Sequence, residues 1–155
     1  MKQRIIWCFC LVLIISGTYA QGTINYSKSR VRQTLRTYCR TNNWPMSSIK
    51  EEPLVTILNI NDTLYQPAVF KYYFNKKDQC YQEQKITFCD SCYHKYAKEY
   101  IDAKRYEWVK LSDTVYVSKY SRNRRLELHP AAHTIDFFKT FWTKEEYDRM
   151  IAGNR

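Results

Sequence analysis

Residues 68–88, AVFKYYFNKKDQCYQEQKITF, decide the expected fold of this chain. β-Branched and aromatic side chains are frequent in the two ends of the stretch, and Asn75-Lys76-Lys77-Asp78 supplies a polar turn between them. We therefore predict two antiparallel strands, Ala68–Phe74 and Cys80–Phe88, joined by that turn. The composition of the 155-residue chain agrees, because an aromatic share of 16% that includes 14 Tyr suits a sheet better than a helical bundle.

Three helices and further strands flank this hairpin. Ser27 can cap a first helix, Asp90 opens a second, and Thr143 with Glu146 forms a capping box for a third that ends near Gly153. Further strands are expected at Leu54–Ile60, Arg105–Leu111, Thr114–Tyr120, Leu126–His129 and Ile135–Trp142. The predicted class is α+β, an antiparallel meander sheet with an N-terminal helix, a middle helix and a short C-terminal helix.

Residues 1–20 have the three-part pattern of a signal peptide. Lys2 and Arg4 precede an apolar run from Ile5 to Ile15, and Thr18-Tyr19-Ala20 supplies the small residues of a cleavage site. The apolar run is shorter than the ~20 residues that span a bilayer, so we expect cleavage and no transmembrane segment afterwards. The protein is therefore expected to be exported, either periplasmic or secreted. No internal repeat or linker divides residues 21–155, which are expected to form a single small domain.

Four cysteines follow the predicted signal peptide, and cysteines of exported proteins most often form disulfides. They are Cys39, Cys80, Cys89 and Cys92. A continuous strand from Cys80 to Phe88 would place Cys80 about 30 Å from Cys89, whereas the Cα atoms of a disulfide lie within about 7 Å. We therefore expect the pairs Cys39–Cys80 and Cys89–Cys92.

Two functional interpretations of these cysteines are less well supported. Cys89-Asp90-Ser91-Cys92 has the C-x-x-C spacing of redox enzymes, but no βαβ unit surrounds it and Asp90 opposes thiolate formation. Zinc could bind Cys80, Cys89, Cys92 and His94, but a second C-x-x-C is missing. We expect neither a metal ion nor another cofactor.

Motifs for catalysis are missing from the sequence. It contains no G-x-S-x-G, and its 3 Gly are too few for a phosphate-binding loop. His129 and His133 lie four residues apart, but Pro130 intervenes and no Glu follows His129 as a zinc protease requires. No pair of carboxylates indicates acid–base chemistry. We predict no catalytic residues and no enzymatic activity.

A basic segment at residues 119–125 is a candidate anion-binding site. Its cationic members are Lys119, Arg122, Arg124 and Arg125, in a chain with a formal charge of +10. Arg and Lys beside Tyr can bind phosphate or sulfate groups of lipids or polysaccharides. A solvated turn between two strands is the plainer interpretation. An exported protein rarely meets nucleic acid, so we expect no nucleic-acid partner.

Four features together resemble a known group of proteins. They are the signal ending at Ala20-Gln21, the Ser27-x-x-x-Val31-x-x-x-Leu35 helix start, Phe70–Phe74 leading to Cys80, and the closing segment Trp142–Tyr147. In this pattern the chain resembles the small exported proteins of unknown function that are common in Bacteroidota genomes. The resemblance implies an envelope location and transfers no catalytic residue.

The predicted function is that of an exported, non-enzymatic domain that binds a protein or a cell-envelope component. One alternative is a secreted eukaryotic effector or toxin-like protein held together by disulfides, for which Asn25 and Asn61 offer N-glycosylation motifs. Another alternative is an enzyme with an unrecognised site.

We expect the mature protein to begin at Gln21, because cleavage after Thr18-Tyr19-Ala20 follows a short apolar core. The intact mass of protein recovered from the exported fraction measures this directly. Recovery of the chain with residues 1–20 still attached, in a membrane fraction, would contradict the prediction.

Overall fold

The computed structural model describes residues 22–61 and 67–153. These residues form an eight-stranded antiparallel sheet and three α-helices, which is the predicted α+β class. The predicted signal peptide, residues 1–20, lies outside the described residues. None of the described helices combines the length and the apolar character needed to cross a membrane.

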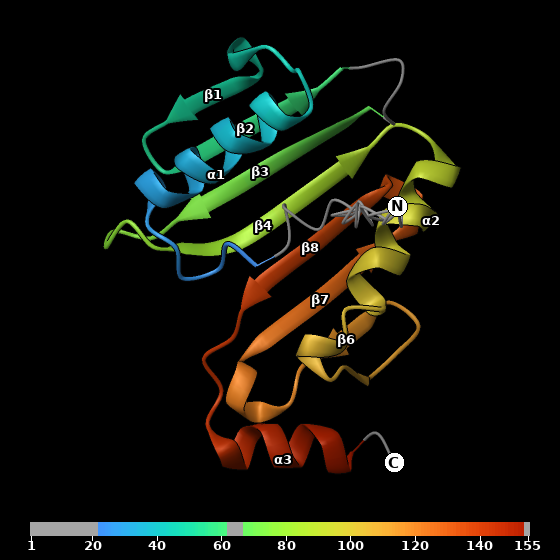
Figure 1. Cartoon of the computed structure of the whole chain (residues 1–155). Coiled ribbons are helices and arrows are strands. Elements are labelled where there is room, and N and C mark those ends of the chain that lie inside the picture. The colour runs from blue at the N-terminus through green and yellow to red at the C-terminus, as the bar shows by residue number, and fades with distance from the viewer. Residues whose placement is uncertain (1–21, 62–66, 154–155) are drawn as a thin grey trace, which may run out of the picture.

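The sheet consists of two four-stranded meanders joined side by side (Figure 1). The first meander contains β1 (Ile49–Glu52), β2 (Val55–Ile60), β3 (Ala68–Phe74) and β4 (Cys80–Thr87). The second contains β5 (Val109–Lys110), β6 (Val115–Val117), β7 (Arg124–His129) and β8 (Thr134–Lys139). The strand order is β1-β2-β3-β4-β8-β7-β6-β5, so the last strands of the two meanders pair with each other in the middle.

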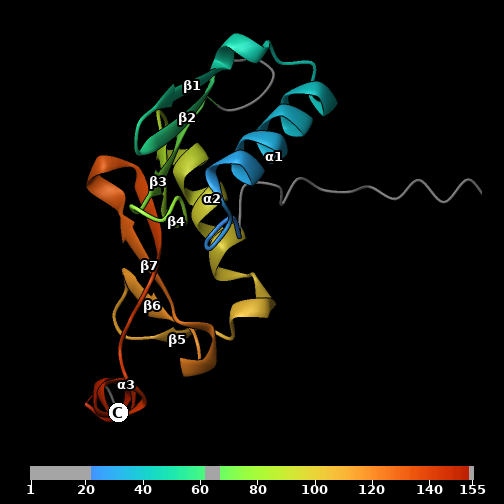
Figure 2. The same cartoon turned by 90° about the vertical axis from the view of Figure 1, so that its left-hand side faces the viewer.

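One helix precedes each meander, and both helices lie on the same face of the sheet (Figure 2). They are α1 (Lys28–Thr41) and α2 (Asp90–Ile101). The order helix, then four strands, therefore occurs twice, arranged about the β4–β8 pair. The third helix, α3 (Lys144–Ala152), follows β8 and lies beyond the ends of the strands, and the predicted capping box of Thr143 and Glu146 is present at its start.

The hairpin of β3 and β4 forms as predicted. Asn75 fixes its turn, because the Asn75 Oδ1 atom accepts hydrogen bonds from the backbone N–H groups of Lys77 at 2.9 Å and Gln79 at 3.1 Å. Asp78 takes a left-handed conformation with φ of 59°, which Asp tolerates better than most residues. β4 ends at Thr87, one residue before the predicted end.

Other element boundaries differ from the predictions. The sequence did not predict β1, whose residues Ile49–Glu52 are mainly exposed and charged and carry no strand pattern. The predicted strands Arg105–Leu111 and Thr114–Tyr120 are only β5 and β6, because short 3₁₀ turns at 104–106 and 120–122 replace their outer parts. Both turns end in left-handed residues that interrupt an extended chain.

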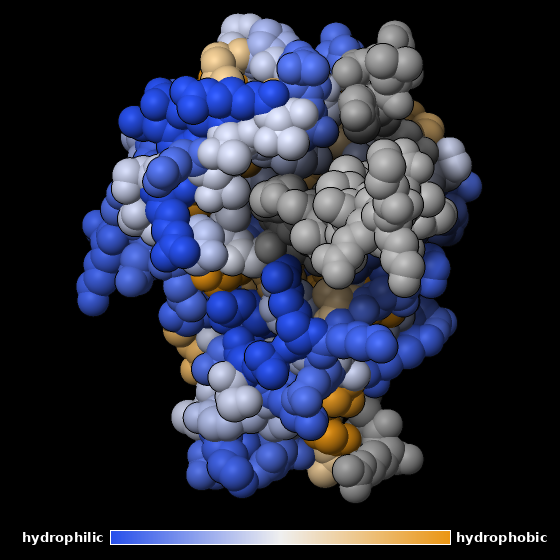
Figure 3. All heavy atoms as spheres, viewed as in Figure 1, coloured by the Kyte–Doolittle hydropathy of each residue, from blue (hydrophilic) through white to orange (hydrophobic). Residues whose placement is uncertain are grey.

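The main core lies between the sheet and the helices α1 and α2. It is formed by side chains that alternate along the strands and repeat at helical spacing along α1 and α2. The largest fully buried ones include Leu35, Leu58, Tyr72, Tyr100, Leu126 and Phe137. Around α1, the side of the molecule seen in Figure 3 is mainly hydrophilic, with hydrophobic residues in small separate patches.

We expect Tyr100→Ala to lower the free energy of unfolding by roughly 3 kcal/mol or more, as truncations of large core aromatics do. Tyr100 is 2% exposed, and its ring contacts that of Phe137 at a centroid distance of 5.9 Å. Urea unfolding measures the change, and Lys95→Ala, on the exposed side of the same helix, is the control. A loss within about 0.5 kcal/mol of the control would contradict this account of the core.

Candidate functional site

The face of the sheet opposite α1 and α2 is not covered by any described α-helix (Figure 2). We call this surface the open face. The strand register arranges its central residues in three rows. The rows are Val55-Tyr73-Gln82-Phe138-Arg125, Ile57-Lys71-Gln84-Asp136-Glu127 and Asn59-Val69-Ile86-Thr134-His129. Apolar side chains are concentrated on β2 and β3, and polar ones on β7 and β8.

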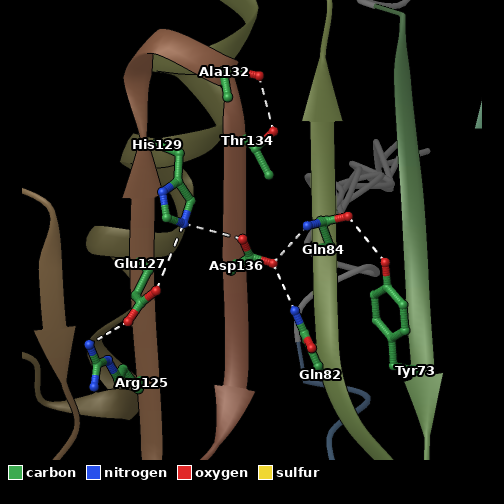
Figure 4. A network of polar contacts seen from close by, with 9 residues as sticks. All are labelled: Tyr73, Gln82, Gln84, Arg125, Glu127, His129, Ala132, Thr134 and Asp136. Carbon is green, nitrogen blue, oxygen red and sulfur yellow. Dashed lines mark hydrogen bonds and ion pairs between the residues drawn. The ribbon is translucent and has the colours of Figure 1, made fainter.

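Asp136 is the centre of a hydrogen-bond network on the open face (Figure 4). Its Oδ1 atom accepts hydrogen bonds from the side-chain amides of Gln82 at 2.9 Å and Gln84 at 3.1 Å. The Gln84 carbonyl oxygen in turn accepts a hydrogen bond from the hydroxyl of Tyr73 at 3.2 Å. Asp136 is 9% exposed, and these hydrogen bonds from the neighbouring strand β4 hold its carboxylate in place.

His129 connects the network to the carboxylate of β7. Its Nε2 atom lies 3.3 Å from Asp136 Oδ2 and 3.8 Å from Glu127 Oε2. Glu127 also forms an ion pair with Arg125, whose guanidinium lies over the ring of Phe138. These contacts arrange side chains from β3, β4, β7 and β8 in one continuous polar surface.

The four basic residues of the segment 119–125 do not lie together in one site. Arg124 and Arg125 are consecutive in β7 and so point to opposite faces of the sheet. Arg124 donates to the carbonyl oxygens of Arg122 and Asn123, whereas Arg125 binds Glu127 on the open face. Lys119 is exposed but pairs with Glu107 at 3.0 Å. Of the predicted anion-binding residues, Lys119 and Arg122 are exposed, whereas Arg124 and Arg125 are partly buried.

The C-x-x-C segment forms the expected disulfide between Cys89 and Cys92 at the start of α2. The expected pair Cys39–Cys80 is wrong for this structure, because both are buried free thiols. Cys80 exchanges backbone hydrogen bonds with the segment just before α1, through Tyr26 O and Asn25 N. Cys39 lies near the other end of α1, about 18 Å from the N-cap residue Ser27 at a rise of ~1.5 Å per residue. A disulfide needs Cα atoms within about 7 Å.

The other predicted ligands are also separated. β4 places Cys80 at the end opposite the Cys89–Cys92 disulfide, and no group of three or more metal-binding side chains exists among the described residues. His133 contacts Asp90 and the ring of Tyr93 near the start of α2, and His129 lies on the open face. The two histidines therefore belong to different environments.

A second polar cluster, which the sequence analysis missed, lies in the core on β4. Glu83 is 3% exposed, and its Oε1 atom accepts hydrogen bonds of 2.6 Å from both the backbone N–H and the hydroxyl of Thr23. Burial raises the pKa of Glu83 to about 7, although hydrogen bonds from Thr23 and Gly22 and the charge of Lys85 oppose the rise. The Glu83 Oε2 atom is buried and has no hydrogen-bond partner among the described residues.

Lys85 lies two residues further along β4 and is also 3% exposed. Its ammonium group is enclosed by three rings, with centroid distances of 3.5 Å to Tyr96, 4.4 Å to Phe70 and 5.3 Å to Tyr100. Cation–π contacts of this kind stabilise the charged amine in place of water. Burial nevertheless lowers the pKa of Lys85 to about 7, while the charges of Glu99 and Glu83 partly counteract the decrease.

One signal in the sequence could have indicated these core charges. A strand with neighbours on both sides sends alternate residues to opposite faces, so two of the four residues Gln82-Glu83-Gln84-Lys85 must point to the core. Knowing that β4 is central would therefore have predicted buried polar groups. Sequence alone did not show that β8 pairs with it.

The comparisons with known proteins add no family or structural relative. The chain matches no protein-family model, no curated protein and no solved structure. We therefore base the functional proposal on the described geometry, namely the polar network of the open face and the buried charges of β4.

We expect the stability of the wild-type protein to rise between pH 7 and pH 9 because of Lys85. The pKa of Lys85 is about 7 in the folded state, whereas the unfolded chain has the ordinary lysine value of 10.5. Between pH 7 and pH 9 the unfolded chain therefore binds more protons than the folded protein, so the free energy of unfolding rises with pH. In the Lys85→Met variant, the rise in the free energy of unfolding between pH 7 and pH 9 should be smaller by roughly 2 kcal/mol. Urea unfolding at both pH values measures it, with the exposed Lys95→Met as control. Equal pH dependence in Lys85→Met and the wild type would show that Lys85 is charged in the fold.

Proposed function

We propose that this protein is an exported, non-enzymatic domain whose open face binds a protein partner in the cell envelope. The observation that carries the proposal is the two-sided sheet. One face carries α1 and α2, whereas the other presents three rows of partly exposed side chains without a described helix over them.

The composition of the open face supports a protein as the partner. Val55, Ile57 and Val69 form an apolar area at one side, and Asp136 and His129 form a polar area at the other. Transient protein interfaces combine apolar and hydrogen-bonding groups in this way. A lipid or polyanion site would cluster cations, whereas the three rows contain two, Lys71 and Arg125, and Arg125 is paired with Glu127.

The network around Asp136 supports binding with defined orientation. Gln82 and Gln84 hold the carboxylate before any partner arrives, so binding need not order these side chains, and that lowers its entropic cost. His129 is 45% exposed at its side chain and offers a polar contact beside the fixed carboxylate. Positioned polar groups of this kind contribute to specificity.

We propose binding rather than catalysis because the polar groups contact one another in the pattern of a structural network. The recorded ionic partners of His129 are two carboxylates, Glu127 and Asp136. The hydroxyl of the neighbouring Thr134 donates to the carbonyl oxygen of Ala132. The described residues thus show no nucleophile directed at this histidine.

We expect a photo-crosslinker, p-benzoylphenylalanine, at Val69 to form a covalent adduct with one discrete protein in intact cells. The same crosslinker at Lys95, on the exposed side of α2, is the control for position and should form no such adduct. Ile57→Glu combined with the crosslinker at Val69 should reduce the adduct about tenfold or more, because a buried charge would enter the apolar part of the interface.

The matched control for charge is Lys95→Glu combined with the crosslinker at Val69, which should leave the adduct unchanged. A circular dichroism spectrum of each variant confirms the fold. Equal adducts from Val69 and Lys95, or an adduct unaffected by Ile57→Glu, would contradict binding through the open face.

A further inference from the structure

The Cys89–Cys92 disulfide lies where β4 ends and α2 begins, and its two sulfurs differ in exposure. Cys89 is the N-cap residue of α2 and is partly exposed, whereas Cys92 is 1% exposed. The sulfur of Cys89 is therefore the one that a thiolate from solvent can reach. Neither cysteine belongs to the open face, so the function proposed above leaves this disulfide without a role.

The start of α2 stabilises negative charge on the Cys89 sulfur. The backbone N–H of Cys92 donates to this sulfur at 3.1 Å, and the hydroxyl of Ser91 lies 3.3 Å from it. The positive end of the helix dipole adds to these contacts, because Cys89 caps the first turn of a helix of 12 residues. A cysteine at a helix N-terminus is more easily released as a thiolate, which makes it a better leaving group in disulfide exchange.

Asp90 places a negative charge beside Cys89, but the fold weakens its effect. The Asp90 Oδ1 atom lies 3.5 Å from His94 Nε2 and 3.6 Å from His133 Nε2, and its side chain is 78% exposed. Water and these imidazoles therefore screen the carboxylate. The absence of a βαβ unit matters less as well, because the end of β4 and the start of α2 supply the local strand-to-helix geometry.

An apolar side chain next to the disulfide offers a contact to a polypeptide. Phe88 directly precedes Cys89 and is 62% exposed. A cysteine in a polypeptide with an apolar neighbour can contact Phe88 while its sulfur reaches Cys89. A thiol carried by an unfolded or extended polypeptide therefore fits this surface.

We propose that the Cys89–Cys92 disulfide oxidises a pair of thiols in a partner polypeptide by thiol–disulfide exchange. A partner thiolate attacks Cys89 Sγ, which forms a mixed disulfide and breaks the bond to Cys92, and Cys92 leaves with the electron pair and takes up a proton. The second partner thiolate then attacks the partner sulfur of the mixed disulfide and displaces Cys89 as a thiolate.

The electrons balance between the two chains. The partner loses two electrons and two protons and gains a disulfide, while Cys89 and Cys92 gain the two electrons and become free thiols. Each protein molecule therefore oxidises one dithiol and is consumed in doing so, which is a stoichiometric reaction and not enzymatic turnover.

The test mixes the purified oxidised protein with an unstructured peptide that contains two reduced cysteines, one of them beside a phenylalanine. Mass spectrometry follows the loss of two hydrogens from the peptide and their gain by the protein. We expect up to one equivalent of peptide to be oxidised, at an initial rate about tenfold or more above that of glutathione disulfide at the same concentration. The double variant Cys89→Ser/Cys92→Ser, which keeps the buried thiols of Cys39 and Cys80, should oxidise no peptide.

A rate no higher than that of glutathione disulfide, with the Cys89–Cys92 bond intact by mass, would overturn the proposal. This comparison uses the wild-type protein alone, so it does not depend on the folding of a variant. The reaction takes place at the start of α2, so its result is independent of crosslinking at Val69 on the open face.

The two single variants test which sulfur is attacked. Each is reduced and mixed with the disulfide-linked dimer of a peptide that has one cysteine. Cys92→Ser should accumulate a mixed disulfide between Cys89 and the peptide, because no second thiol in the protein releases it. Cys89→Ser should accumulate about tenfold less, because Cys92 is buried. Equal amounts from two variants with the wild-type circular dichroism spectrum would contradict attack at Cys89.

Discussion

Four consecutive polar residues, Gln82 to Lys85, occupy the middle of a strand that has neighbours on both sides. Because strand residues alternate, two of the side chains must enter the core and two must lie on the open face. The rest of the structure accommodates this constraint. Thr23 binds Glu83, three rings enclose Lys85, and Asp136 binds both glutamines. The helix side and the open face are thus linked through one strand.

The polar residues on the open face and those in the core differ in how their polar groups are satisfied. On the open face, the carboxylate of Asp136 is also largely buried, but it accepts hydrogen bonds from the amides of both Gln82 and Gln84. In the core, Glu83 and Lys85 lose hydration, and their pKa values move toward neutrality in opposite directions. Buried charges of this kind seldom add to stability, so their presence favours a role beyond packing.

Local patterns in the sequence predicted the local structure well. The period-two pattern and the Asn75 turn predicted β3 and β4, and the Ser27 cap and the Thr143–Glu146 box predicted the starts of α1 and α3. These features depend on residues within a few positions of each other. The Cys89–Cys92 bridge was predicted because a continuous strand after Cys80 keeps Cys80 away from both of these cysteines, and it is present in the structure.

Contacts between distant segments were not predictable in this way. The error over Cys39 and Cys80 arose because excluding the pairs of Cys80 with Cys89 and Cys92 left Cys39 as its partner, while the direction of α1 relative to β4 was unknown. The basic segment 119–125 was considered as one patch, although strand alternation separates Arg124 from Arg125. The open-face network joins β3, β4, β7 and β8, and only the β4–β8 pairing brings its members together.

That pairing also has a consequence for the order of folding. β4 and β8 are separated by roughly fifty residues, and β8 is the last of the described strands to be synthesised. Until it arrives, the first meander has a free edge at β4, whose unpaired backbone groups could join another chain. The polar Gln82 and Gln84 and the charged Glu83 and Lys85 make that edge unattractive for aggregation. The same residues that complicate the finished core can thus protect the unfinished molecule while it waits for its C-terminal half.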